Sequence, residues 1–407
     1  MSRHDAMRRA LAPVNVAAIE RNVRRLRSEL TGETQMCAVV KANGYGHGAL
    51  QSARAALAGG ASWLAVAGAQ EAVELRGGGL ARVPLLVMGA LSEQERREAL
   101  AARADVVVWH EHEVEAVARA GGGRVHVKLD TGMGRLGTRD RSEAERVLAA
   151  AEASDNVELV GVMTHFATAD DRDDGGFFAG QLQHFREWVA ELKAKRPGLL
   201  AHAANSAATL RDPGSHLDMV RCGIAVYGMD PFGADPLAVE LEPALELRSY
   251  VAEVKLCAAG ESVGYGRRFV AERELPIAVL PIGYGDGWRR ALSPGCEVLI
   301  DGRRWPLVGT VSMDNVTVSL AAAGDLSSAQ ALRGREAVLI GADGDERITA
   351  EEVAKRLKTI NYEVSCGLTA RVPRCHHRDG EPLAGPDEDQ AGVISGGAPA
   401  AEPLEAQ

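Results

Sequence analysis

Residues 35–60, "QMCAVVKANGYGHGALQSARAALAGG", decide how this chain folds. They open with an apolar run typical of a buried strand, pass through a glycine-rich turn, and end in a segment whose apolar residues recur at helical spacing. This order predicts one strand followed by one helix. Lys41 stands where the strand ends, and a charged lysine is costly there because burial disfavours its charged form.

The same unit of strand and helix repeats along the chain as far as residue 228. Segments with helical periodicity, such as "EHEVEAVARAGG", separate the apolar, β-branched runs. Eight units over roughly 200 residues match a closed (β/α)8 TIM barrel, and their regularity favours closure over an open doubly wound sheet. The eight predicted strands are "QMCAVVKA", "SWLAVA", "VPLLVMGA", "ADVVVWH", "RVHVKLD", "VELVGVMTHF", "LLAHAANS" and "LDMVRCGIAVYG".

The 407 residues are enough for two domains. Prolines and glycines in "DPFGADPLAVELEP", residues 230–243, mark a boundary, so we assign residues 1–238 to the barrel and 239–380 to a mostly β domain. One helix is expected in "TAEEVAKRLKTI", with Thr349 as N-cap and Glu352 as its capping-box partner. Residues 381–407, rich in Gly, Pro, Ala and acid, are predicted to be a disordered tail.

Composition narrows the class of partner. A net charge of -10 offers no basic field for nucleic acid or an anionic membrane, so a small molecule is the expected partner. The charged N-terminus has no apolar stretch for a signal peptide or a membrane span, which predicts a cytoplasmic protein. Six cysteines without a CxxC pair give no sign of zinc, and no metal site is expected.

Polar residues follow several of the predicted strands. In a (β/α)8 barrel the carboxyl ends of the strands form the active-site face. A lysine with a lowered pKa suits a bond to a carbonyl compound such as pyridoxal phosphate, and glycines with a serine suit its phosphate. The alternative is a glycine-rich turn whose lysine extends to solvent. The residues placed at this face are Lys41, Arg135, His165, Asn205, Ser206, Arg221, Gly223 and Ile224.

Nine motifs, in order, resemble the alanine racemase family of fold-type-III pyridoxal-phosphate enzymes. The resemblance runs from about residue 10 to about residue 378, and it implies a barrel with a C-terminal β domain and a homodimer with shared active sites. It implies interconversion of L- and D-alanine, which provides D-alanine for peptidoglycan synthesis. The motifs are "VVKANGYGHG", "VKLDTGMGRLG", "VMTHFATAD", "ANSAATL", "VRCGIAVYG", "VGYGRRF", "PIGYGDGWRR", "GTVSMDN" and "TINYEVSCGLTARVPR".

The resemblance also implies roles for individual residues. Lys41 would carry the cofactor as a covalent aldimine and act as one acid/base group, and Tyr265 of the second subunit would be the other. His165, with Arg221 behind it, would assist Tyr265, while Arg221 would face the pyridine nitrogen and keep it unprotonated. The phosphate would be held by Tyr45, Ser206, Gly223, Ile224 and Tyr362, with Asn205 also at the cofactor.

The remaining implied roles concern the substrate. Arg135 would bind the cofactor's phenolic oxygen and the substrate carboxylate. Met313 would reach the substrate from the second subunit and contact it through its backbone. Tyr284 would line the entry channel and keep the pocket small, and Lys128 occupies a position that is carbamylated in some relatives. Two residues depart from the common family pattern, Gly44 where alanine is frequent and Thr310 where arginine is common.

Three other functions remain open from the sequence. One is a racemase of broader specificity, for serine or another small amino acid. A second is a fold-type-III amino-acid decarboxylase, which Arg221 opposes because those enzymes place a carboxylate at the pyridine nitrogen. A non-catalytic carrier of pyridoxal phosphate is the third, and the β domain with Tyr265 argues against it.

Overall fold

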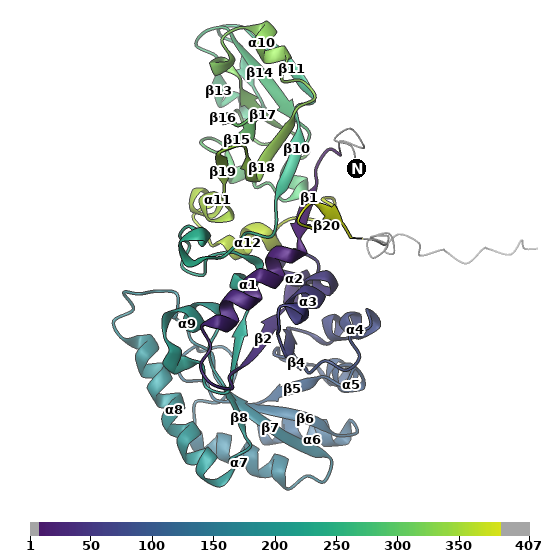
Figure 1. The fold of residues 1–407 in the computed structure, drawn as a ribbon, viewed down its shortest axis with the longest axis vertical. Coiled ribbons are helices and arrows are strands. Elements are labelled where there is room, and N and C mark those ends of the chain that lie inside the picture. The colour runs from purple at the N-terminus through teal and green to yellow at the C-terminus, as the bar shows by residue number, and fades with distance from the viewer. Residues whose placement is uncertain (1–7, 384–407) are drawn as a thin grey trace, which may run out of the picture.

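The computed structural model describes residues 8–383 and has a closed barrel of eight parallel strands at its centre (Figure 1). The eight predicted strands all form, so the predicted closed barrel with a C-terminal mostly β domain is confirmed. In order around the barrel, the strands are β2 (Gln35–Val39), β3 (Trp63–Val66), β4 (Leu85–Val87), β5 (Asp105–Val108), β6 (Gly123–Lys128), β7 (Val157–Met163), β8 (Leu200–His202) and β9 (Met219–Cys222).

Helices follow the strands and cover the outside of the barrel (Figure 1). Their apolar faces explain why they pack there: α8 buries Phe185, Trp188 and Leu192, which lie on one side of the helix. Among residues 8–383, no helix is both long enough and apolar enough to cross a bilayer. The helices are α1 (Val16–Ser28), α3 (Ala49–Ala58), α4 (Ala69–Gly77), α5 (Glu93–Ala101), α6 (Glu111–Arg119), α7 (Arg141–Glu152), α8 (Phe177–Lys195) and α9 (Ser206–Arg211).

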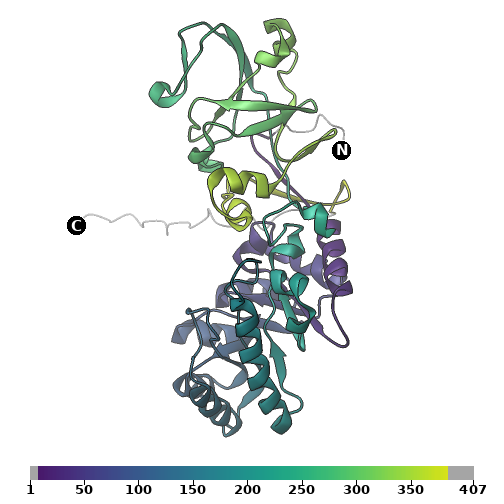
Figure 2. The same ribbon diagram turned by 90° about the vertical axis from the view of Figure 1, so that its left-hand side faces the viewer.

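A second domain lies at the other end of the molecule's long axis (Figures 1 and 2). The helices α11 (Ala350–Leu357) and α12 (Asn361–Cys366) lie where this domain meets the barrel. Near its far end, a short ladder pairs β12 (Ser262–Val263) with β13 (Phe269–Val270). Its main sheet has the strand order β10 (Leu247–Tyr250), β18 (Glu336–Asp343), β15 (Glu297–Ile300), β16 (Arg303–Val308), β17 (Val316–Ser319), β14 (Leu275–Leu280) and β11 (Glu253–Cys257), with β19 (Glu346–Ile348) on β18.

The two ends of the described chain pair with each other. Strand β1 (Ala12–Asn15), which the sequence analysis did not predict, runs parallel to β20 (Arg374–Arg378). The N-terminal segment is thus hydrogen-bonded to the C-terminal part of the chain, although we assigned it to the barrel domain. The remaining domain limits stay predictions.

Strand β21 (Glu381–Pro382) contradicts the first part of the predicted disordered tail. It pairs antiparallel with β20 across a tight turn, in which Asp379 and Gly380 have φ of 48° and 94°. Two positive φ values in a row are what an Asp-Gly hairpin turn requires, so backbone pairing orders this segment despite its polar composition. The rest of that prediction, from residue 384, lies outside the described residues.

Candidate active site

Lys41 opens a left-handed turn directly after β2. The short element α2 (Lys41–Tyr45) has φ of 52° at Ala42, 52° at Asn43, 62° at Gly44 and 52° at Tyr45. A left-handed conformation costs a non-glycine residue about 1–2 kcal/mol, so three of these residues store backbone strain. Glycine at position 44, where the family often has alanine, removes that cost from a fourth residue.

Contacts from several parts of the chain hold this turn. The side chain of Asn43 accepts a hydrogen bond from the backbone N–H of Ala49 at 2.9 Å. From the C-terminal domain, Arg374 Nε donates to the carbonyl of Gly46 at 2.9 Å. His47, which is fully buried, donates through Nδ1 to backbone carbonyls of the turn, and burial lowers its pKa to about 3. The strained turn is therefore fixed from both domains.

The electrostatic surroundings of Lys41 favour its neutral amine. Burial lowers the pKa of Lys41, and the positive charges of Arg135 and Arg221 lower it further. Burial likewise lowers the pKa of Lys128 to about 8, again with help from those two arginines. A neutral amine is the nucleophilic form of lysine, so Lys41 suits a covalent bond to a carbonyl compound.

Arg221 is buried without a carboxylate partner among residues 8–383. Its guanidinium donates to Nδ1 of His202 at 2.9 Å, to Nδ1 of His165 at 3.3 Å and to the carbonyl of Thr164 at 2.8 Å. Burial lowers the pKa of Arg221 to about 10 and also holds the pKa of both histidines well below its usual range. Arg221 thus stays charged at neutral pH beside two neutral imidazoles.

A chain of hydrogen bonds leads from Arg221 through the barrel interior. Because a guanidinium can only donate, His202 accepts at Nδ1 and its Nε2–H donates to Nδ1 of His126 at 2.9 Å. His126 in turn donates through Nε2 to Asp105 at 3.2 Å. Our sequence reasoning missed all three residues beyond Arg221. Strand alternation was the available signal, since His126 lies two residues before Lys128 and shares its face of the strand.

The residues predicted to hold a phosphate come together from both domains. The hydroxyl oxygen of Ser206 accepts from the backbone N–H of Gly223 at 2.9 Å, and Ile224 is the next residue. A Cβ at Gly223 would lie 2.3 Å from the hydroxyl of Tyr45, so only glycine permits this approach. The ring of Tyr362, from α12, lies 5.9 Å from that of Tyr45. Hydroxyls and backbone N–H groups are donors that suit a phosphate, so this cradle fits pyridoxal phosphate.

Asn205 and Arg135 lie at the same face of the barrel. The side chain of Asn205 caps α9 by accepting from the backbone N–H of Ala208 at 2.9 Å, and Asn205 shares a cavity of about 320 Å³ with Tyr362. Arg135 is exposed in the loop after β6, which the carboxylate of Asp130 organises. The cofactor and substrate roles of both residues stay predictions.

Three of the four predicted residues of the C-terminal domain have side chains exposed at the surface of the chain. Tyr265 begins the turn η4 (Tyr265–Arg267), between β12 and β13, at the opposite end of its domain from α2 (Figures 1 and 2). Its side chain is 71% exposed, while that of Tyr284 is 41% and that of Met313 51% exposed. Solvent-exposed tyrosine and methionine side chains of this kind are typical of a surface that contacts another molecule.

The barrel and its site define a class of enzyme. A lysine of lowered pKa at the end of the first barrel strand, a group of phosphate-binding residues and a buried arginine are the components that pyridoxal-phosphate chemistry requires. Family models agree: that of "Alanine racemase, N-terminal domain" matches residues 14–231, and that of "Alanine racemase, C-terminal domain" matches residues 244–376. The chain belongs to the alanine racemase family, whose members are pyridoxal-phosphate-dependent amino-acid racemases.

Individual relatives cover nearly the whole chain. Alanine racemase 1 of Bacillus subtilis is 39% identical over 93% of this chain and 96% of its own length, and alanine racemase of Geobacillus stearothermophilus is 42% identical over 92% and 95%. The solved alanine racemase from Bacillus anthracis with bound L-Ala-P has a TM-score of 0.82 at 36% identity, covering 92% of this chain and 97% of its own. That from Streptomyces coelicolor has 0.83 at 37%, covering 90% and 97%.

Proposed function

We propose that this chain interconverts L- and D-alanine with two acid/base groups, Lys41 of one subunit and Tyr265 of a second. One observation carries the proposal: the barrel holds a low-pKa lysine, whereas Tyr265 is 71% exposed on the other domain. Racemisation needs a proton removed from one face of the α-carbon and another delivered to the opposite face. A homodimer that places Tyr265 over the partner's Lys41 supplies both faces.

Pyridoxal phosphate is the cofactor that the cradle fits. When bound, it supplies an electron-withdrawing ring that acidifies the α-hydrogen of an amino acid. Lys41 would hold it covalently, Tyr45 and Ser206 would bind its phosphate, and Arg221 would face its ring nitrogen. Arg221 has no carboxylate partner within residues 8–383, so its charge is available to keep that nitrogen unprotonated.

His165 prepares the second acid/base group. Because Arg221 donates to its Nδ1, the neutral imidazole of His165 carries its hydrogen on Nε2. That N–H would donate to the phenol oxygen of Tyr265 of the partner subunit and favour the phenolate over the phenol. The partner's Tyr265 would then take a proton from L-alanine, and Lys41 would deliver one on the opposite face.

Three more residues would select the substrate. Arg135 would bind the substrate carboxylate, since a guanidinium presents paired donors to a carboxylate. Tyr284 and Met313 of the partner subunit would close the pocket around a methyl side chain. This closure favours alanine over larger amino acids.

The test is an incubation of the purified protein and pyridoxal phosphate with a panel of L-amino acids. Enantiomers are separated by chiral chromatography, and released carbon dioxide is measured in parallel. We expect D-alanine to form without carbon dioxide. Carbon dioxide without racemisation would identify a decarboxylase instead, and equal rates with serine would identify a racemase of broader specificity.

Shared active sites are tested with two inactive variants. Lys41→Ala and Tyr265→Phe chains are mixed under conditions that allow subunits to exchange. One of the two sites in each hybrid dimer then has both groups intact, so activity should return. If subunits exchange and activity stays absent, the two residues do not serve one site across the interface.

Two further roles follow from the same proposal. Burial brings the pKa of Lys128 to about 8, which leaves enough neutral amine to react with carbon dioxide, and we propose that it is carbamylated beside Arg135. Carbon-13 NMR after incubation with labelled bicarbonate would reveal the carbamate. We also propose that the enzyme supplies D-alanine for peptidoglycan in the cytoplasm. It should then support growth of a bacterium without alanine racemase when no D-alanine is added.

A further inference from the structure

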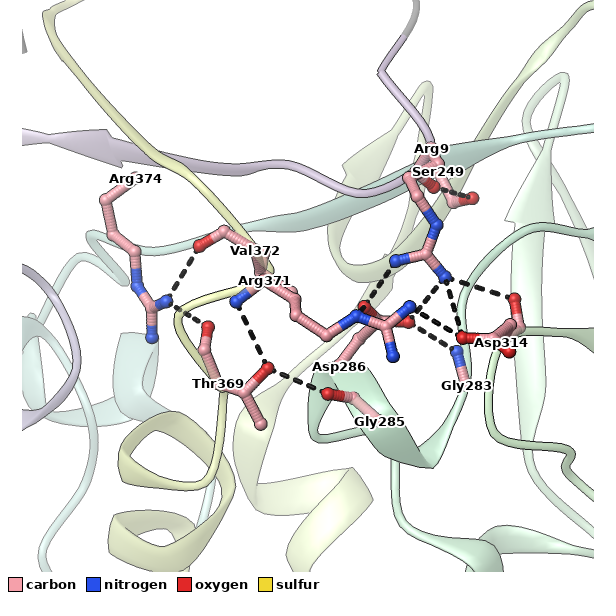
Figure 3. Close-up of polar contacts among 10 residues, drawn as sticks. All are labelled: Arg9, Ser249, Gly283, Gly285, Asp286, Asp314, Thr369, Arg371, Val372 and Arg374. Carbon is pink, nitrogen blue, oxygen red and sulfur yellow. Dashed lines mark hydrogen bonds and ion pairs between the residues drawn. The ribbon is translucent and has the colours of Figure 1, made fainter. Parts of the chain in front are cut away.

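Two arginines and two aspartates form a compact ionic cluster where the N-terminal segment meets the C-terminal domain (Figure 3). We call Arg9, Asp286, Asp314 and Arg371 the clamp. Arg9 donates to both carboxylate oxygens of Asp286, at 2.5 and 2.9 Å, and Arg371 Nε lies 3.4 Å from the same carboxylate. Arg371 also donates through Nη2 to Asp314 at 2.6 Å. The side chain of Asp286 is fully buried, so its charge depends on these partners.

The clamp joins the two loops that present Tyr284 and Met313. Asp286 ends the turn η5 (Tyr284–Asp286), and Asp314 directly follows Met313. Backbone hydrogen bonds connect these loops: Tyr284 N–H donates to the carbonyl of Ser312 at 3.0 Å, and Gly285 N–H donates to that of Met313 at 2.9 Å. The two exposed side chains therefore belong to one hydrogen-bonded unit.

Close packing leaves that unit little freedom to shift. A Cβ at Gly283 would lie 2.3 Å from the carbonyl oxygen of Ser312 and 2.5 Å from that of Met313. A Cβ at Gly285 would lie 2.3 Å from Nη1 of Arg371, so the guanidinium packs directly on the loop backbone. Arg371 thus holds the loop by contact as well as by charge.

Residues 368–374, which run from the end of α12 to the first residue of β20, connect the clamp to the Lys41 turn of the same chain; Figure 3 shows Thr369, Arg371, Val372 and Arg374 of this segment. The hydroxyl of Thr369 donates to the carbonyl of Gly285 at 2.9 Å, and Arg374 Nη1 donates to the carbonyl of Thr369 at 2.7 Å. Arg374 Nε reaches the carbonyl of Gly46, next to the strained turn. One short segment therefore contacts both a chain's own site and the loops it would lend to its partner.

We propose that Arg371 is a positioning residue, which fixes Tyr284 and Met313 in the geometry that the partner subunit's active site requires. This inference rests on the sharing of sites in the proposed function. Arg371 and Arg9 together balance the negative charges of Asp286 and Asp314. The two loops therefore stay joined, although the side chains of Tyr284 and Met313 are exposed. A misplacement of about 1 Å at an active site can lower the rate roughly 100-fold. Loss of the clamp should therefore lower the catalytic rate by a measurable amount.

The hybrid dimer provides the test, because its single intact site takes Tyr284 and Met313 from the Lys41→Ala chain. Arg371→Gln is introduced into either the Lys41→Ala chain or the Tyr265→Phe chain. In the Lys41→Ala chain we expect kcat/KM for L-alanine to fall roughly tenfold or more, mainly through a higher KM. In the Tyr265→Phe chain the same substitution should change kcat/KM less than twofold.

Asp314→Asn, which keeps the shape and removes the charge, should show the same dependence on which chain carries it. Arg333→Gln is the matched control, since Arg333 pairs with Glu253 at 3.5 Å in the same domain but outside the clamp. The positioning role would be overturned if the substitution had equal effects in the two chains, or no effect in the Lys41→Ala chain, which supplies Tyr284 and Met313. A parent hybrid without activity would instead overturn the shared site, and this inference with it.

Discussion

Replacing Thr310 by valine should lower kcat/KM about fivefold for both enantiomers, and it should slow solvent exchange of the α-hydrogen more for L-alanine than for D-alanine. The hydroxyl of Thr310 donates to the backbone carbonyl of Tyr265 at 2.9 Å, and Thr310 itself is buried at 6% exposure. This bond fixes the turn that carries the proposed second acid/base group. A neutral hydrogen bond contributes about 1 kcal/mol net, which corresponds to roughly a fivefold change in an equilibrium. Valine keeps the shape and removes only the hydroxyl.

The assay is exchange of the α-hydrogen with deuterium from solvent, followed separately for each enantiomer. Tyr265 would act on the hydrogen of L-alanine and Lys41 on that of D-alanine, so Thr310→Val should slow exchange from L-alanine more. Thr310→Ser keeps a hydroxyl and should retain most of the rate, and Thr317→Val controls for the substitution elsewhere in the domain. Equal slowing for both enantiomers, or none, would refute the reasoning.

Two other predictions concern the barrel. Gly223→Ala would bring a Cβ within 2.3 Å of the hydroxyl of Tyr45, so cofactor affinity should fall at least tenfold in an absorbance titration; Gly180→Ala, where nothing lies within 4 Å, is the control. Burial lowers the pKa of His47 to about 3 and holds the pKa of His202 well below 6.5, so both are neutral in the folded protein. In the unfolded chain both would bind protons below pH 6.5. Stability should therefore fall as pH drops from 6.5, by up to about 1.4 kcal/mol per pH unit for each histidine, measured by urea unfolding; a flat profile between pH 6 and 4 would contradict this.

Much of the barrel could be predicted because its signal is local and repeated. Each strand is a short apolar run, and Lys41 is recognisable as the polar residue that ends the first of them. The helix α11 was predictable in the same way, with Thr349 accepting from the backbone N–H of Glu352 at 3.1 Å. The expected reciprocal bond is replaced, since the carboxylate of Glu352 pairs with Arg304 at 2.9 Å. Arg304, which is distant in the sequence, thus binds the carboxylate that the local capping motif would otherwise use.

What the sequence could not predict depends on residues far apart in the chain. The clamp joins Arg9 to Asp286, which are 277 positions apart; Asp286 lies in the motif "PIGYGDGWRR", but nothing in that motif indicates Arg9 as its partner. The histidine chain behind Arg221 joins three different barrel strands, so it exists only once the barrel closes. Side-chain identity shows which residues can pair, but closure of the fold decides which of them meet.

The pairing of β1 with β20 imposes an order on how the chain can fold during synthesis. Ala12 leaves the ribosome long before its partner Arg374, because the whole barrel and most of the second domain lie between them in the sequence. Until Arg374 has been synthesised, the edge of β1 that pairs with β20 is unpaired. Closing the long loop between the two strands slows folding more than it lowers the stability of the folded protein. The barrel strands have partners much earlier. Nascent chains should therefore pass through a stage with a formed barrel and an open N-terminal strand, in which chaperone binding and aggregation compete with completion of the second domain.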